Sequence, residues 1–212
     1  MTEGRPERAD AARNRRAILN AAERLLTQFP PHRVSVERIA AEAGVGKGTV
    51  FHRFGSRAGL MRDLMLERAL ALREAVTDGP PPLGPGAPAR ERLFAFVDAV
   101  VEVAGRNKGL LATLGRDAAA IGGSEEDARK QESVYGFWHD HLSRLIAEER
   151  PDLDAELLAH ALLATLGHGP VVRLLSEGGA ARVAAVLRGL AEGALDGTAD
   201  VRAPSHAATR QE

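Results

Sequence analysis

Residues 35–60 read SVERIAAEAGVGKGTVFHRFGSRAGL, and this stretch contains two short helical patterns separated by a turn that holds a glycine. Ser35 is placed to cap the first helix, which we expect over residues 36–43, because its hydroxyl can accept from a free backbone N–H. Gly44 ends that helix, since glycine readily adopts the left-handed conformation of a helix end. The second helix is expected over residues 47–53. The stretch therefore predicts two helices joined by a tight turn.

Two short helices joined in this way are typical of a helix-turn-helix, whose second helix enters the major groove of DNA. The apolar positions have the spacing to pack these helices together: Ile39, Ala40, Ala43, Val45, Val50 and Phe54. The other positions of the second helix face outward. Among them Gly48 costs about 1 kcal/mol of helix stability relative to alanine, which close approach of the backbone to another surface would explain. The predicted DNA contacts are Ser35, Lys47, Gly48, Thr49, Phe51, His52, Arg53 and Arg57.

Arg57 belongs to this set for a separate reason. It is expected at the first position of the following helix, where the helix dipole disfavours a cation. An arginine beside free N–H groups forms a good anion site, and a DNA phosphate is the natural occupant. The charge distribution agrees, because residues 1–60 carry 11 Lys and Arg against 6 Asp and Glu in a chain whose net charge is −1.

The rest of the chain shows helical periodicity and favours an all-α fold of about nine helices. Residues 1–9 are expected to be a flexible arm, residues 10–55 a helix-turn-helix domain, and residues 56–196 a larger helical domain. Gly197 begins a tail, 197–212, that we expect to be flexible. The expected helices beyond this motif cover residues 10–29 and 56–77, then, after a proline-rich loop at 78–89, residues 90–104, 107–121, 125–149, 154–176 and 180–195.

Several functional classes find no support in the sequence. GVGKGT resembles a phosphate-binding loop, but it lacks the Walker spacing and a preceding strand, and no other catalytic motif is present, so we expect no enzyme. His139 and His141 point apart on a helix, and His160 and His168 are two turns apart, so we assign no metal and no cofactor. The chain has no cysteine, no apolar N-terminal leader and no apolar run of membrane length. We therefore expect a cytoplasmic protein with no membrane contact.

Residues 39–60, IAAEAGVGKGTVFHRFGSRAGL, resemble the DNA-binding domain of the tetracycline-repressor-like (TetR/AcrR) family, which has the form I-A-x-x-A-G-V-x-x-G-T-[LIV]-Y-x-[HR]-F-x-[SD]-[KR]-x-x-L. The resemblance implies that Gly48 and Thr49 face the DNA, that Lys47 contacts a phosphate or base, and that Arg57 holds the DNA backbone. Phe51 replaces the family's usual tyrosine and removes a hydroxyl that reaches a phosphate.

The resemblance also implies a homodimer that binds a palindromic operator, with an effector cavity and a dimer interface in the C-terminal domain. The expected function is a repressor released from its operator by a small hydrophobic effector. The alternative is a helix-turn-helix regulator that responds to protein contacts and binds no small molecule. The predicted effector-binding residues are Leu64, Phe96, Leu110, Leu114, Tyr135, Trp138, His141 and Leu142. The predicted dimer residues are Leu158, Leu162, Leu166, Val183, Val186, Leu187 and Leu190.

Overall fold

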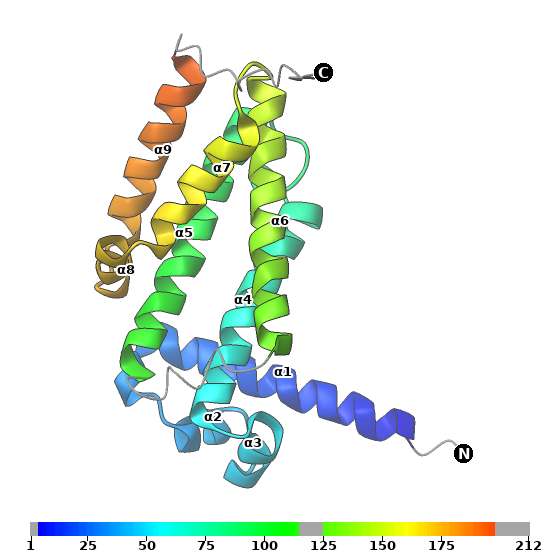
Figure 1. Cartoon of the computed structure of the whole chain (residues 1–212). Coiled ribbons are helices and arrows are strands. Elements are labelled where there is room, and N and C mark those ends of the chain that lie inside the picture. The colour runs from blue at the N-terminus through cyan, green and yellow to red at the C-terminus, as the bar shows by residue number, and fades with distance from the viewer. Residues whose placement is uncertain (1–3, 115–124, 198–212) are drawn as a thin grey trace, which may run out of the picture. The chain divides into compact units, whose positions relative to one another are not determined.

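The computed structural model describes residues 4–114 and 125–197, which form α-helices and short 3-10 turns and, within those ranges, no strand (Figure 1). The all-α class and the count of nine helices are confirmed for this part of the chain. The predicted tail beyond Gly197 lies outside the described residues. The helices are α1 Gly4–Gln28, α2 Val36–Glu42, α3 Lys47–Phe54, α4 Arg57–Asp78, α5 Ala89–Leu114, α6 Glu125–Glu149, α7 Ala155–Ala164, α8 Gly169–Ser176 and α9 Ala180–Asp196.

The chain divides into two compact units, of which the first contains Met1–Ala71 and Arg106–Arg129 and the second Leu72–Gly105 and Lys130–Glu212. Both α4 and α5 therefore contribute to each unit. This division differs from the predicted boundary after residue 55, because the first part of α4 supplies buried residues to the first core. The residues concerned are Leu60, Met61 and Leu64.

The core of the first unit joins α1, α2, α3 and α4. Ile18 of α1 and Ile39 of α2 are completely buried, and Val50 of α3 is 1% exposed. Phe54, at the end of α3, belongs to the same cluster. Because both buried residues of α3 are apolar, this short helix is held by one side and leaves the other side free.

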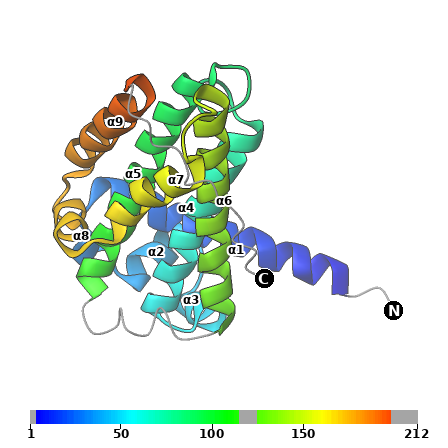
Figure 2. The same cartoon turned by 45° about the horizontal axis from the view of Figure 1, so that its top comes forward.

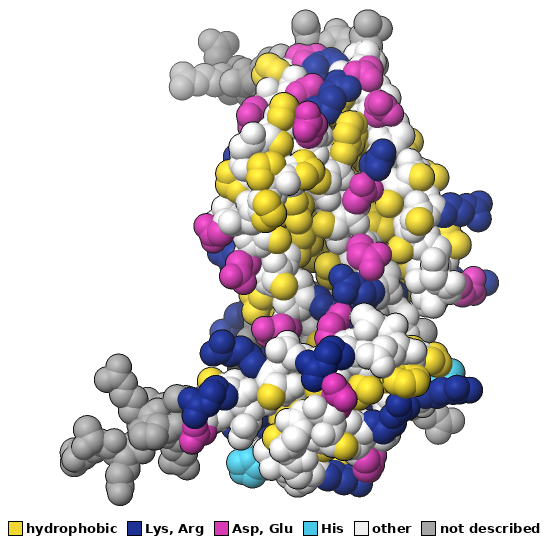
Figure 3. All heavy atoms as spheres, turned by 180° about the vertical axis from the view of Figure 1, so that it is seen from behind, with side chains coloured by type: hydrophobic (Ala, Val, Ile, Leu, Met, Phe, Trp, Pro, Cys, Tyr) yellow, Lys and Arg dark blue, Asp and Glu magenta, His cyan; other side chains and the backbone are white. Residues whose placement is uncertain are grey.

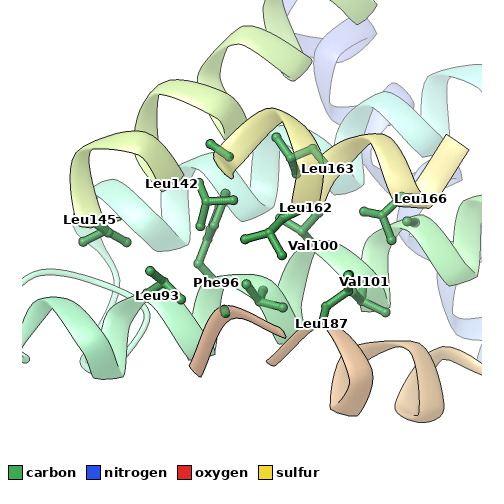
Figure 4. Packing of buried hydrophobic residues seen from close by; sticks show 14 of the residues in the cluster. Leu93, Phe96, Val100, Val101, Leu142, Leu145, Leu162, Leu163, Leu166 and Leu187 are labelled. Atoms are coloured by element: carbon green, nitrogen blue, oxygen red, sulfur yellow. The ribbon is translucent and has the colours of Figure 1, made fainter. Parts of the chain in front are cut away.

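The core of the second unit joins α5, α6, α7 and α9, whose order in space is visible in Figure 2. Figure 4 shows Leu93 and Phe96 of α5 together with Leu142 and Leu145 of α6. Leucines of α7 and Leu187 of α9 complete the cluster in the same view. The packing of branched aliphatic side chains dominates this core.

The first helix begins at Gly4, six residues before the predicted start at Asp10. The part of the predicted arm from residue 4 to residue 9 is therefore helical, and residues 1–3 lie outside the described residues. Pro6 did not prevent this, because a proline in the first turn of a helix loses no hydrogen bond. Asp10 does not cap the helix but lies inside it and pairs with Arg13.

The predicted break between residues 104 and 107 is wrong, because α5 runs without interruption from Ala89 to Leu114. Gly105 does not end the helix but allows a close approach. A Cβ atom at Gly105 would lie 3.1 Å from the Cβ of Ala180 and 3.7 Å from Cδ2 of Leu175. The remainder of the predicted helix 107–121, from residue 115 onward, lies outside the described residues.

The predicted single helix over residues 154–176, kinked at Pro170, is two helices. After α7 a 3-10 turn covers Thr165–Gly167, His168 is extended, and α8 begins at Gly169. The two parts are bent by 60°. Pro170 lacks an N–H and in a continuous helix its ring would clash with the carbonyl four residues earlier, so a new helix starts here with Pro170 in its first turn.

Within the described ranges, no single helix combines the length and the apolar character needed to cross a membrane. The bent pair formed by α7 with its 3-10 turn and α8 meets that criterion only when its two parts are taken together.

Candidate nucleic-acid interface

The turn between α2 and α3 is built by local hydrogen bonds that the sequence predicts. The Ser35 hydroxyl accepts from the backbone N–H of Arg38 at 3.3 Å, which confirms Ser35 as the cap of α2. Gly44 has a φ of +68°, which confirms the expected left-handed end. The N–H of Val45 donates to the carbonyl of Ala40 at 3.0 Å and closes the turn. The start of α3 is thereby held in a fixed position relative to α2.

The side of α3 opposite its buried residues carries the predicted DNA contacts. Lys47, Gly48, Phe51 and His52 are exposed, while Thr49 is half-buried. A Cβ atom built on Gly48 would meet no atom within 4 Å, so packing inside the chain does not require a glycine there. The expectation that Gly48 allows an outside surface to approach the backbone is therefore compatible with this geometry.

Lys47 is held in place by two neighbours. Its Nζ lies 2.5 Å from Oε1 of Glu37 and 5.6 Å from the centre of the Phe51 ring. The hydrogen bond from Lys47 is the main cause that lowers the pKa of Glu37 to about 2, with smaller contributions from its own backbone N–H and from Ser35. A phosphate that binds Lys47 must therefore compete with an ionised carboxylate.

Arg57 and Arg53 do not simply point into solvent. The guanidinium of Arg57 donates to the carbonyl of Pro31 at 3.0 Å, which ties the start of α4 to the connection between α1 and α2. Arg53 is half-buried, and its Nε is buried without an acceptor among the described residues. Arg57 thus positions the helices of the motif as well as presenting a cation near the start of α4.

Sequence reasoning missed a second group of basic residues, which lies before α2 and in its first turn. His32 and Arg33 are exposed in the 3-10 turn Pro31–Arg33. Arg38 stacks over the Phe29 ring at 4.1 Å and donates to the carbonyl of Arg33 at 3.0 Å. Figure 3 shows Lys and Arg side chains spread over the surface of this unit. The sequence signal that could have identified this group is the presence of three basic residues, His32, Arg33 and Arg38, close to Ser35.

The predicted effector-binding residues are divided between the two units. Leu64 and Leu110 lie in the core of the first unit. In the second unit, Phe96, His141 and Leu142 are buried, and Trp138 packs against the core. Tyr135 is 39% exposed and its hydroxyl lies 2.8 Å from Nδ1 of His160. The side chain of Leu114 lies outside the described residues.

The predicted dimer residues also occupy two different environments. Four of them are covered by the chain itself: Leu162, Leu166, Val183 and Leu187. These four side chains belong to the core of the second unit, so their predicted contact with a partner stays a prediction. Val186 and Leu190 are 58% and 57% exposed, Leu158 is half-buried, and Leu157, which was not predicted, is 62% exposed.

In the described part of the chain, no group of three or more His, Cys, Asp or Glu residues could hold a metal ion. His139 and His160, from α6 and α7, do come together, with ring centres 3.8 Å apart in a stacked arrangement. Stacked rings direct their nitrogens away from a common point, so this pair has the geometry of a packing contact.

Comparison with known proteins finds a family model that matches part of the N-terminal unit. Residues 18–64 match the family model for bacterial regulatory proteins of the tetR family. This range contains the whole of α2 and α3 and the turn between them. The comparison with curated proteins finds no match.

Solved structures extend the likeness to most of the chain. A TetR-like transcriptional regulator from Rhodococcus sp. RHA1 is 23% identical, with 87% of this chain and 96% of that chain covered and a TM-score of 0.50. The TetR family transcriptional regulator PfmR from Thermus thermophilus is 21% identical, with 86% and 98% covered and a TM-score of 0.53. A TetR-family regulator from Rhodococcus sp. is 20% identical, with 86% and 98% covered and a TM-score of 0.55. Residues 18–64 therefore carry the sequence pattern of the tetR family of bacterial regulatory proteins, and the chain is similar in fold to solved TetR-family transcriptional regulators.

Proposed function

We propose that α3 is the recognition helix of this regulator and that it binds in the major groove of operator DNA. The observation that carries the proposal is the two-sidedness of α3, which buries Val50 and Phe54 and exposes Lys47, Gly48 and Phe51. Thr49 offers a hydroxyl and a methyl group to a phosphate or a thymine. A helix held by one apolar side in a helix-turn-helix has the geometry that major-groove readout requires.

Contacts to the DNA backbone would come from the residues around α3. Ser35, His52, Arg53 and Arg57 belong to this predicted set, and phosphate contacts of this kind fix the register of a protein on the duplex. Since Arg57 already donates to Pro31, its remaining N–H groups are the ones available to a phosphate. This division predicts that Arg57 supports both the motif and the DNA contact.

The regulator is proposed to act as a homodimer on a palindromic operator in the cytoplasm. Two helix-turn-helix units bind half-sites about one DNA turn, roughly 34 Å, apart, so a twofold protein reads a twofold site. Exposed Val186 and Leu190 on α9 and Leu157 on α7 are large apolar side chains that a partner would cover. Their exposure supports an interface on these helices.

A small hydrophobic effector bound by the second unit is proposed to release the DNA, which makes the protein a repressor. An effector changes operator affinity only if it binds the operator-binding conformation and the released conformation with different affinities, and the coupling free energy is typically about 1–3 kcal/mol. Supporting residues are Phe96, Trp138, His141 and Leu142, which lie together on the α5–α6 side of the second core or pack against it.

The test is binding to DNA from immediately upstream of the protein's own gene, titrated with salt against a scrambled duplex. We expect tighter binding to the natural duplex, a twofold-symmetric footprint, and a loss of affinity of at least about tenfold in Thr49→Ala. The matched control is Thr77→Ala, an exposed threonine near the end of α4 in the second unit. Equal affinity for both duplexes and an unchanged Thr49→Ala variant would contradict the proposal.

A further inference from the structure

Three buried hydrogen-bond donors in the second unit have no acceptor among the described residues. They are Nε of Arg92 on α5, Nε1 of Trp138 on α6 and Nε2 of His141 on α6. His141 is only 3% exposed, and its ring meets the Phe96 ring edge-on with centres 4.7 Å apart. A buried donor without a partner costs free energy, so three such groups on two packed helices call for an explanation.

The protonation of His141 follows from its one hydrogen bond. Nδ1 of His141 lies 2.8 Å from a terminal nitrogen of Arg144. A guanidinium has only donors, so Nδ1 must accept and the ring proton must sit on Nε2. The unpaired Nε2 is therefore a donor, as are the unpaired nitrogens of Trp138 and Arg92. All three buried groups require an acceptor.

The charges around these donors favour an anionic acceptor. Neither Arg92 nor Arg144 forms an ion pair with any carboxylate in the described ranges. Both lie close enough to His141 for their charges to lower its pKa, although burial is the larger cause. Arg73 stacks on the Phe137 ring at 5.1 Å, and that ring in turn stacks on His141. Arg73 and Arg144 are exposed and Arg92 is half-buried, so the positive charge lies at the edge of the buried donors. Positive charge beside unpaired donors favours a bound anion.

The surroundings of the same donors are apolar. Phe96 and Leu142 are buried beside His141, and Phe137 and Trp138 pack against the core of this unit. A ligand that satisfies both features carries an anionic head on an apolar body. Aromatic and aliphatic walls with a few fixed polar groups are the usual composition of small-molecule sites.

We propose that the second unit binds the anionic head, a carboxylate or a phosphate, of a small amphiphilic ligand at Arg92, Trp138 and His141. This assignment rests on the effector function proposed above and specifies the chemical class of the effector. Arg144 contributes by holding the His141 ring in the tautomer that donates from Nε2. The apolar body of the ligand lies against the phenylalanines of α5 and α6.

The protein carries its own reporter, because Trp138 is its single tryptophan. Titration of the full chain with octanoate and with octyl phosphate, followed by the emission of Trp138, measures binding without DNA. Octan-1-ol and octylammonium have the same apolar body and lack the negative charge. We expect saturable binding of at least one anion that is at least about tenfold tighter than that of octan-1-ol, since hydrogen bonds to charged groups are the strong ones. The tighter of the two anions identifies the head group.

Two variants test the residues. Arg92→Gln removes the charge and His141→Phe removes the donor while keeping an aromatic ring against Phe96. Each should weaken anion binding by about tenfold and leave octan-1-ol binding unchanged. Arg182→Gln, on an exposed arginine of α9, is the matched control and should bind like the wild-type chain. Should either variant fail to fold, as judged by circular dichroism, Arg92→Lys keeps the charge and loses the Nε donor.

Three outcomes overturn the assignment: no response to either anion, equal affinity for octanoate and octan-1-ol, or anion binding that survives Arg92→Gln and His141→Phe. Failure of the proposed effector function looks different. In that case the anion binds as expected but operator affinity, measured on the same samples, does not change. Release of the operator by an uncharged compound, with no anion response, would keep the effector function and overturn the anion site.

Discussion

The two units place their polar groups in opposite ways. In the first unit, α3 buries apolar Val50 and Phe54 and exposes Lys47 and His52. In the second unit, α5 and α6 bury donors of Arg92 and His141 inside an otherwise aliphatic and aromatic core. An outward polar face suits a large hydrated ligand such as DNA, whereas buried donors suit a small ligand that is taken out of water.

This difference has an energetic basis. The exposed polar groups of α3 cost little while they are hydrated, and within α3 only Nε of Arg53 is buried without an acceptor. Buried donors without acceptors cost about 1–3 kcal/mol each, so the second unit is less stable than it would be with its acceptors supplied. A ligand of the second unit should therefore stabilise the fold, while a ligand of the first should mainly be selected by surface contacts.

The largest expected effect separates the two sides of α3. Phe54→Ala should lower the free energy of unfolding by about 3–5 kcal/mol, because it removes a large ring that is 7% exposed. Phe51→Ala, three residues earlier and 40% exposed, should change stability by less than about 1 kcal/mol and weaken operator binding. Urea unfolding and DNA binding of both variants provide the measurements. Comparable destabilisation by the two substitutions would show that α3 does not have one buried and one free side.

The sequence was sufficient for the turn between α2 and α3 because short-range spacing controls it. Ser35 and Gly44 act as predicted, since a helix cap and a left-handed turn depend on residues within a few positions. The second unit depends on contacts between distant segments. Gly105 looks like a helix end in the sequence, but its role is set by Ala180, which packs against it. No local pattern contains that information.

The candidate sites differ in the same way. The outward positions of α3 follow from the helical period once Val50 and Phe54 are assigned to the core. Periodicity also identified apolar stripes on α7 and α9, but it could not say which stripe faces the chain's own core. Leu162 and Leu187 are buried, whereas Leu157, Val186 and Leu190 are exposed. Which donors of α5 and α6 lack acceptors could be known only from the packed structure.

Acid should affect stability through His141. Burial, and then the charges of Arg144 and Arg92, lower the pKa of His141 from 6.5 to about 4. Between these two values the unfolded chain binds a proton that the folded chain does not. Stability should therefore fall as the pH drops from about 6.5 to about 4, by about 3 kcal/mol in total at roughly 1.4 kcal/mol per pH unit.

The measurement is chemical denaturation at several pH values for the wild-type chain and His141→Phe. Carboxylates also contribute in acid, so the difference between the two proteins isolates His141. The difference between the two pH slopes should shrink above pH 6.5. Identical slopes in wild type and His141→Phe would contradict a buried neutral imidazole.

A smaller effect is expected at an ion-pair network within the first unit. Glu23 of α1 accepts from Arg68 of α4 at 3.0 Å and from Arg106 of α5 at 2.9 Å. The Arg68 side chain is only 8% exposed. Glu23→Ala should lower the free energy of unfolding by about 1–3 kcal/mol, because it leaves a largely buried guanidinium with fewer acceptors.

The matched control is Glu42→Ala, which breaks a pair with Arg24 whose side chains are 54% and 41% exposed. Exposed pairs contribute about 0–1 kcal/mol, so this variant should remain close to the wild type. Thermal and urea unfolding of the two variants side by side provide the measurement. A Glu42→Ala loss as large as that of Glu23→Ala would mean that burial of Arg68 is not what makes the network important.

The smallest expected effect concerns affinity and not stability. Glu37 holds Lys47 at 2.5 Å and, with a pKa of about 2, keeps its negative charge throughout the neutral and mildly acidic range. Glu37→Gln removes a carboxylate from the proposed DNA face and frees Lys47 for a phosphate, so operator affinity should rise by about twofold to fivefold. The gain should be largest at low salt, since exposed charges are screened as ionic strength increases. Glu42→Gln, at the other end of α2, is the control for charge alone. Fluorescence anisotropy across a salt series measures the operator affinity of both variants. Equal gains in the two would reduce the role of Glu37 to overall charge. A gain confined to Glu37→Gln would identify Lys47 as the residue that the carboxylate restrains.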